Sequence, residues 1–277
     1  MPYSCFSVSI TDAIAHITLN RGEELNTITP DFWRELPEII KEIDAQASAR
    51  VIVLSADGKH FTAGMDIGVF AGLAPNPQEE RGRAQARLMR SIQKLQESFT
   101  CLEQSRIPVI VATQGACIGA GLDLVCACDM RFCTQDAYFT IHEINIGMTA
   151  DVGTYPRLTK LLPDGPLREL AYTGRKLNAD KAVRLGFVNE VFKTHEEMMA
   201  TVMNTANEIA SKSPLAIWGS KEMINYSRDH TIVDTLKYVA TWQAGMFQEK
   251  DVREGLSAQI DKRPAEYDDL LSDKDLF

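Results

Sequence analysis

The chain contains 277 residues, of which 45% are hydrophobic and 24% charged, a composition typical of folded globular proteins and not of disordered or fibrous chains. Its 29 basic and 38 acidic residues give a net charge of -9, which argues against a nucleic-acid partner because phosphates would be repelled. No apolar run is long enough to cross a bilayer, and no targeting segment is visible. We therefore expect no membrane partner and a cytoplasmic location, with an organellar matrix as the alternative.

Alternating strands and helices are expected up to residue 195. Residues 6–20 alternate apolar and polar positions around a Thr-Asp turn, which predicts a β-hairpin with one buried face. Thr29 followed by Pro30 predicts the start of a helix, with apolar residues at helical spacing behind it. Strands are also expected at 51–54, 61–67, 109–113, 130–133, 138–142 and 187–192, and helices at 83–104, 154–162, 167–173 and 179–184.

The pattern changes at Thr194, which forms a capping box with Glu197. From there to Gln259 almost every residue favours helix. The alternation before this point predicts an α/β core over residues 1–195, followed by a helical region over 196–277. The six cysteines contain no CxxC pair and are expected to be buried free thiols, and the five histidines have no metal-binding spacing, so no metal site is expected.

A glycine-rich turn, Gly115-x-x-x-Gly119-x-Gly121, lies between an expected strand and a helix. It lacks the third glycine of a dinucleotide fingerprint and the GK[ST] ending of a phosphate-binding loop. The turn would leave free N–H groups at a helix start, which favours an oxyanion site; the alternative is that the glycines serve only close packing. A second donor is suggested by the segment 61–66, which could present the N–H of Met65.

Together these two segments resemble the active site of the crotonase (enoyl-CoA hydratase/isomerase) superfamily. The resemblance is carried by Leu19-Asn20-Arg21, Leu25-Asn26, Ala63-Gly64-Met65-Asp66, the glycine-rich turn, Cys128-Asp129-Met130-Arg131, Asp251-Val252-Arg253-Glu254-Gly255 and Lys262-Arg263-Pro264. It implies a spiral of ββα units with a C-terminal helical region that packs in trimers, often paired into hexamers. It also implies an acyl-CoA thioester substrate whose carbonyl is held by two backbone N–H groups.

By motif position, the two donors implied by the resemblance are Met65 and Ala120. Relatives commonly carry glycine at the second position, so the methyl group of Ala120 affects how closely a thioester can approach. The same resemblance assigns further substrate and coenzyme A contacts to Arg21, Glu24, Leu25, Ala63, Gly64, Asp66, Ile67 and Gly119. For the first three of these, simple solvent exposure is the alternative.

Three acids decide the subclass within the family. Hydratases that resemble this chain carry a Glu after the glycine-rich turn and a second Glu twenty residues later. Here those positions hold Asp123 and Glu143, and Asp151 stands where hydratases usually have glycine. The set is similar to the Δ3,5-Δ2,4-dienoyl-CoA isomerases. A solvated surface charge is the alternative for any one acid, but three acids at the spacing of this site favour catalysis.

The resemblance and the chemistry assign roles to these acids. Glu143 would remove the proton from C2, Asp123 would deliver a proton to C6, and Asp151 would hold or tune Glu143. Neither a metal nor a redox cofactor is expected. His142 is expected on a strand with its side chain opposite to Glu143, and His60 in a loop.

Three rival functions stay open at this point: an enoyl-CoA hydratase, a Δ3-Δ2 isomerase on the same scaffold, and a binding or scaffold protein, including one that binds RNA. The retained acids and the net charge of -9 argue against the last. Residues 231–248 carry more apolar side chains than one small helical layer can bury, which predicts a trimer or a dimer of trimers.

Overall fold

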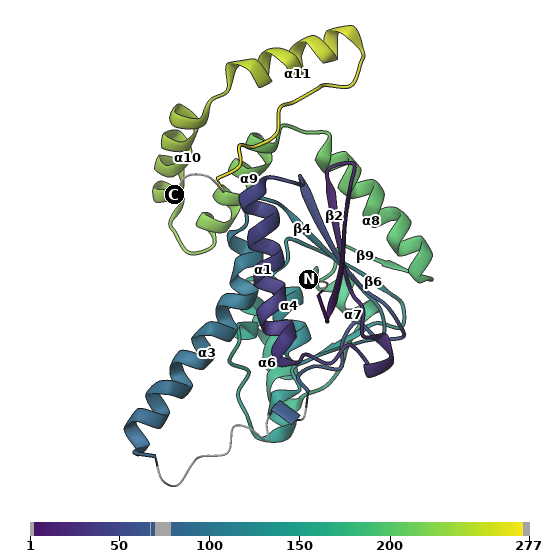
Figure 1. Ribbon diagram of the computed structural model, residues 1–277, viewed down its shortest axis with the longest axis vertical. Coiled ribbons are helices and arrows are strands. Elements are labelled where there is room, and N and C mark those ends of the chain that lie inside the picture. Colours follow the sequence, from purple (N-terminus) through teal and green to yellow (C-terminus); the bar gives the residue numbers. More distant parts are fainter. Residues whose placement is uncertain (1–2, 67, 70–78, 274–277) are drawn as a thin grey trace.

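The computed structural model describes residues 3–66, 68–69 and 79–273 (Figure 1). A six-stranded sheet in the order β1-β2-β3-β4-β6-β9 forms its centre. Strands β1 and β2 form the expected antiparallel hairpin, and the other neighbours are parallel. The strands are β1 (Phe6–Thr11), β2 (Ile14–Leu19), β3 (Val51–Ala56), β4 (Val109–Thr113), β6 (Met130–Thr134) and β9 (Glu190–Phe192).

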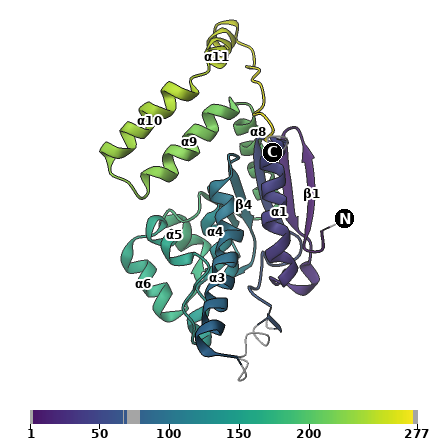
Figure 2. The ribbon, with the colours of Figure 1, turned by 60° about the vertical axis from the view of Figure 1, so that its left-hand side comes forward.

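Helices cover both faces of this sheet, as Figures 1 and 2 show. On one face lie α1 (Pro30–Gln46), α3 (Arg81–Gln104) and α4 (Ala120–Ala127), whose apolar residues join the larger buried cluster. On the other face α8 (His195–Ala210) buries Met198 and Val202 against strand residues such as Val53 and Ile110. The central strands β3 and β4 are mainly apolar, as expected for parallel strands covered on both faces.

A smaller sheet in the order β5-β7-β8 stands beside the main one. It consists of β5 (Ala116–Ile118), β7 (Tyr138–Thr140) and β8 (Leu177–Asn178). β5 runs directly into Gly119 and α4, and β7 is followed by the short 3-10 helix η2 (Glu143–Ile146). Because β5 and β7 are parallel neighbours, their C-terminal ends bring the glycine-rich turn and Glu143 to the same edge. Helices α5 (Thr154–Leu161), α6 (Asp164–Thr173) and α7 (Ala179–Arg184) follow.

The last three helices extend away from the sheet (Figure 2). They are α9 (Pro214–Ser227), α10 (Ile232–Met246) and α11 (Glu249–Asp261). Lys221 fixes α9 to the core, since its Nζ donates to the carbonyl oxygens of Leu102 and Ile107 and lies 2.9 Å from Asp129 Oδ2. The division expected at residue 195 stays a prediction; α8, which follows it, packs on the core sheet.

Two expected strands were wrong in part. A strand was expected at 61–67, but residues 61–66 form none. Thr62 and Met65 make only isolated β-bridges, because Gly64 has a φ of +89° that interrupts the extended chain. Ile67 lies outside the described residues. The strand expected at 138–142 ends at Thr140, and His142 has helical dihedral angles before η2, where its side chain is exposed.

Other expectations agree with the structure more closely. The strand expected at 187–192 is reduced to its last three residues, whereas the helices expected in the core shift by only a few residues. All six cysteines are free and buried, as predicted. Within the described ranges, no helix has the length and apolar character needed to cross a membrane.

Candidate active site

Asp123 is the most buried of the three acids, with 0% of its surface exposed. It lies in the first turns of α4, and its Oδ1 accepts hydrogen bonds from the backbone N–H (2.5 Å) and the hydroxyl (2.7 Å) of Thr154. Its Oδ2 is buried and has no hydrogen-bond partner among the described residues. Burial raises the pKa of Asp123 to about 7, against the opposing effect of the Thr154 hydrogen bonds; the charge of Glu143 raises the pKa further.

Glu143 begins η2 and lies against the glycine-rich turn. Its Oε1 is 3.0 Å from the point that a Cβ on Gly119 would occupy, so a side chain at position 119 would press on this carboxyl group. Its Oε2 is buried and unpaired within the part of the chain that the structure describes. Burial raises the pKa of Glu143, and the neighbouring charge of Asp151 adds to the effect. The structure therefore brings Glu143 and Asp123 to one site.

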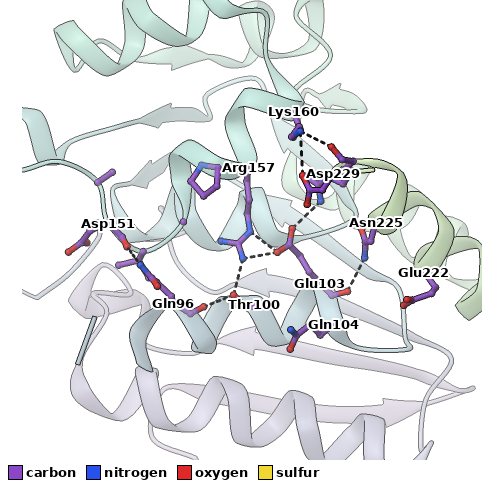
Figure 3. A pocket seen from close by; sticks show the side chains of 15 residues that line it. Gln96, Thr100, Glu103, Gln104, Asp151, Arg157, Lys160, Glu222, Asn225 and Asp229 are labelled. Atoms are coloured by element: carbon purple, nitrogen blue, oxygen red, sulfur yellow. Dashed lines mark hydrogen bonds and ion pairs between the residues drawn. The ribbon is translucent and has the colours of Figure 1, made fainter. Parts of the chain in front are cut away.

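Asp151 is half-buried, and burial raises its pKa as well. Its backbone carbonyl accepts a hydrogen bond of 2.7 Å from the Gln96 amide, and Figure 3 shows the carboxyl group pointing away from the side of Arg157. The charge of Asp151 acts on Glu143. The charge of Asp151 thus disfavours ionisation of Glu143, and the charge of Glu143 disfavours ionisation of Asp123.

The two expected oxyanion donors belong to loops that touch. A Cβ on Gly64 would lie 2.9 Å from the carbonyl oxygen of Ile118, so only glycine permits this approach. Ala120 is the first residue of α4, and helix geometry leaves its N–H without an intrahelical partner. Ile28 pairs with both neighbours of Met65, which turns the Met65 N–H away from that bridge.

The expected coenzyme A loop lies next to these donors. Leu25 accepts a hydrogen bond from the Ala63 N–H and exposes 46% of its surface, and Glu24 is also exposed. The Arg21 guanidinium donates to the carbonyl oxygen of Thr27 at 2.9 Å, so one of its N–H groups stabilises the loop. Asp66 accepts from the Gly68 N–H through Oδ1. The structure thus gathers these residues on one side of the site.

Several residues that hold the site were missed in the sequence. Asn26 is buried and donates to the carbonyl oxygens of Asp57 and His60, while Thr62 Oγ1 accepts from the Gly64 N–H at 3.1 Å. His60 is a loop residue, as expected, but its Nδ1 also accepts from the Ala116 N–H. Their roles depend on contacts between distant segments, which no local motif reveals.

Thr154 was missed as well, although it makes both hydrogen bonds to Asp123. It follows Gly153, whose φ of +137° precedes α5. A Cβ on Gly153 would lie 1.9 Å from the Arg157 guanidinium, which itself pairs with Glu103 at 2.7 Å. Asp151, Arg157 and Glu103 line a cavity of about 510 Å³, and Figure 3 shows the pairing of Arg157 with Glu103. The Arg157–Glu103 ion pair therefore lies directly against Gly153 and limits movement of the loop 150–154.

A family model described as enoyl-CoA hydratase/isomerase matches residues 9–270. The chain belongs to this family. A mitochondrial Delta(3,5)-Delta(2,4)-dienoyl-CoA isomerase of Mus musculus is 41% identical over 93% of this chain and 80% of its own length. A peroxisomal protein of Arabidopsis thaliana with the same activity in its name is 38% identical over 91% of each chain.

Solved structures of this hydratase/isomerase family share the architecture. An enoyl-CoA hydratase from Bacillus anthracis has a TM-score of 0.86 and 28% identity, covering 95% of this chain and 99% of the other. The crotonase-type fold and the family expected from the sequence are therefore confirmed. The roles of the individual site residues stay predictions.

Proposed function

We propose that the protein is a Δ3,5-Δ2,4-dienoyl-CoA isomerase. The observation that carries this proposal is the grouping of three acids at the glycine-rich turn: Asp123 and Glu143 each carry one buried, unpaired carboxyl oxygen, and the charge of Asp151 acts on Glu143. Relatives of 38 to 41% identity bear this activity in their names. The substrate would be a 3,5-dienoyl thioester of coenzyme A.

The proposed reaction is a proton transfer through a stabilised anion. Glu143 takes the proton from C2, and the electron pair moves into a dienolate whose oxygen is held by the N–H groups of Met65 and Ala120. Each such donor contributes roughly 3 kcal/mol to transition-state stabilisation. Asp123 then gives its proton to C6, and the negative charge collapses into the 2,4-dienoyl thioester. Proton return from Glu143 to Asp123 completes the cycle.

The environment of each acid supports this division of roles. A group with a pKa of about 7 still carries a proton in a large share of molecules at neutral pH, as the acid Asp123 requires. Glu143 has a raised pKa as well, which makes it a stronger base than a solvated glutamate while ionised. The role proposed for Asp151 is to hold or tune Glu143, so that Glu143 acts as the base while Asp123 carries the proton.

A hydratase is the second candidate, because solved structures of this family include an enoyl-CoA hydratase at 28% identity. Hydration requires a water molecule held between two carboxylates and aimed at C3. Asp123 is one methylene shorter than the glutamate of hydratases, and Asp151 occupies a glycine position. Both differences favour isomerisation over hydration.

Two parallel assays test the proposal. The protein is incubated with a 3,5-dienoyl-CoA and, separately, with a 2-enoyl-CoA, while conjugated-diene absorbance and water addition are followed. We expect rapid formation of the 2,4-diene and slow hydration. Efficient hydration without diene isomerisation would favour the hydratase.

We further propose that the enzyme works as a trimer or a dimer of trimers. Within α10, Ile232, Val233 and Leu236 expose 79%, 61% and 62% of their surfaces in the single chain. An apolar helix face of this kind is typical of a surface that associates. Light scattering at micromolar concentration would contradict this proposal if it gave a stable species of 30.8 kDa.

The reaction as proposed moves a proton and two double bonds with no net oxidation, so its steps need neither a redox cofactor nor a metal; coenzyme A enters with the substrate. The compartment stays a prediction: the sequence favours the cytoplasm, whereas the mouse relative is named mitochondrial and the Arabidopsis relative peroxisomal. Imaging of the tagged full-length protein in its own cells would decide between these compartments.

A further inference from the structure

Thr154 and Asp123 form a contact that the proposed chemistry does not yet use. They are 31 residues apart in sequence, and both are almost completely buried, at 1% and 0% exposure. Thr154 donates twice to the same oxygen, Oδ1, through its backbone N–H and its hydroxyl. Oδ2 receives no hydrogen bond from any residue in the described ranges. The two oxygens of one carboxyl group therefore have different environments.

This asymmetry determines where a proton can reside. Protonation of an oxygen that already accepts two hydrogen bonds is disfavoured, because the added O–H would use an acceptor position and weaken the bonds from the two donors. The proton of Asp123 is then confined to Oδ2. The same two donors stabilise the carboxylate that forms when the proton leaves, since hydrogen bonds to an ionised acceptor are stronger than neutral ones.

We propose that Thr154 is a positioning residue that confines the transferable proton of Asp123 to Oδ2 and stabilises the carboxylate left after delivery to C6. The inference rests on the proposed isomerase function. In the step concerned, the Oδ2–H bond breaks as the C6–H bond forms from the electron pair of the dienolate. The electron pair of the broken bond stays on Asp123, where Thr154 supports it.

The position of Thr154 is itself fixed by the fold. It is the first residue of α5, so its N–H is one of those that a helix leaves free. One turn later, Arg157 donates to Glu103 and to Thr100 on α3, as Figure 3 shows. This anchor limits movement of the helix start, so the two donors of Thr154 stay aimed at Asp123.

Any pH effect has to be judged against every charged group near Asp123. The titratable or charged groups that act on it or feel its charge are Cys117 on β5, Cys126 on its own helix, Glu143 on η2, and Tyr155 and Arg157 on α5. Thr154 differs from all of them because its hydroxyl does not titrate. Its removal changes hydrogen bonding to Asp123 while the surrounding charges stay the same.

Three variants of the full-length protein test the inference. Thr154→Val keeps the shape and the backbone donor but removes the hydroxyl, and Thr154→Ser restores the hydroxyl. Thr113→Val is the matched control, because Thr113 is also 1% exposed and its hydroxyl donates to the carbonyl oxygen of Phe132 within the sheet. Turnover of a 3,5-dienoyl-CoA, its pH profile, and exchange of the C2 proton in deuterated water are measured for each.

For Thr154→Val we expect kcat to fall by about 10- to 100-fold with KM unchanged, the equivalent of one lost hydrogen bond to a charged group. The alkaline limb of the profile should move to higher pH, because Asp123 becomes a weaker acid. Exchange at C2 should persist, since Glu143 is untouched. Thr154→Ser and Thr113→Val should keep the parental kcat and profile.

An unchanged pH profile in Thr154→Val, or an equal loss of kcat in Thr113→Val, would overturn the inference. Infrared titration of the protonated carboxyl band, assigned with Asp123→Asn, gives a readout that needs no turnover. If the parent protein failed to isomerise the diene, the proposed function would fall. A band that still titrated at higher pH in Thr154→Val would then support the contact between Thr154 and Asp123 by itself.

Discussion

The edge of the core that carries the candidate active site and the C-terminal helices depart from ordinary folding preferences in opposite ways. At the edge of the core, a carboxyl group is buried with incomplete hydrogen bonding. Asp123 is 0% exposed, and its Oδ2 has no hydrogen-bond partner among the residues described. In the C-terminal helices, apolar side chains are exposed: Ile232 shows 79% of its surface to solvent in the single chain. Each arrangement costs free energy in an isolated molecule.

The difference shows what each cost serves. Burying a carboxyl group raises its pKa toward neutrality, which is useful only where protons are transferred. Exposing an apolar helix face is useful only where another surface covers it. If each region depends on its own departure, substitutions in one region should leave the property of the other unchanged.

Removing the carboxylic acids should have the largest effect. Glu143→Gln should lower isomerisation by a factor of about 10² to 10⁴ and also abolish C2 exchange, because the base is lost. Asp123→Asn should lower isomerisation by a similar factor but retain exchange, because only delivery at C6 is lost. Amide variants are nearly isosteric, so folding is preserved. Equal loss of C2 exchange in the two variants would contradict the division of roles.

The second-largest effect on activity should come from Asp151→Gly, which introduces the residue common at this position in hydratases. Isomerisation should fall by about 10-fold or more, while hydration of a 2-enoyl-CoA stays level or rises. Adding Asp123→Glu should increase hydration further, limited by the methyl group of Ala120. Asp164→Gly, an exposed acid on α6, serves as the control and should change neither rate. Parental isomerisation in Asp151→Gly would make Asp151 a bystander.

The exposed helix face can be tested without touching the acids. Ile232→Glu combined with Leu236→Glu should dissociate the assembly, because two charges would be buried at the proposed contact. Thr241→Glu adds charge at another exposed position of α10 and should leave the assembly intact. Sedimentation velocity measures the outcome. An unchanged oligomer in the double variant would place the contact on another surface.

A smaller effect is expected on stability. Burial raises the pKa of Asp123 to about 7, so the folded state binds its proton more tightly than the unfolded state does. The stability contributed by this group is therefore complete at low pH and declines as the pH rises from about 4 to 7. Asp123→Asn should gain about 1 to 3 kcal/mol relative to the parent at pH 8 and little at pH 4. Urea unfolding at both pH values measures this, and an equal difference at each would refute it.

The smallest effect should follow removal of metal ions. The proposed steps use carboxyl groups and backbone donors alone, so dialysis against a chelator should leave kcat unchanged. A loss of activity that Mg²⁺ or Zn²⁺ restores would require a different scheme. Together with the other tests, this measurement separates proton-transfer chemistry from any chemistry that depends on a metal.

The sequence by itself determined the family, the hairpin, most helices of the core and the three acids at their spacing. These features are local: hydrophobic period, capping residues and short motifs are visible along the chain. The extended segment at 61–67 was wrong because one glycine, Gly64, adopts a positive φ to approach Ile118. The strand expected at 138–142 ends at Thr140, and Glu143 lies in the 3-10 helix that follows it.

Only the tertiary structure decided how the acids are held. Burial raises the pKa of Asp123 to about 7 against the hydrogen bonds from Thr154, which α5 brings to it from 31 residues away. Arg157 of the same helix pairs with Glu103 and so ties α5 to α3. A pKa depends on burial and on hydrogen-bond partners from distant segments, and neither can be recognised from a local sequence pattern. The acids and their division of roles could therefore be proposed from the sequence, whereas the contacts that hold Asp123 could not.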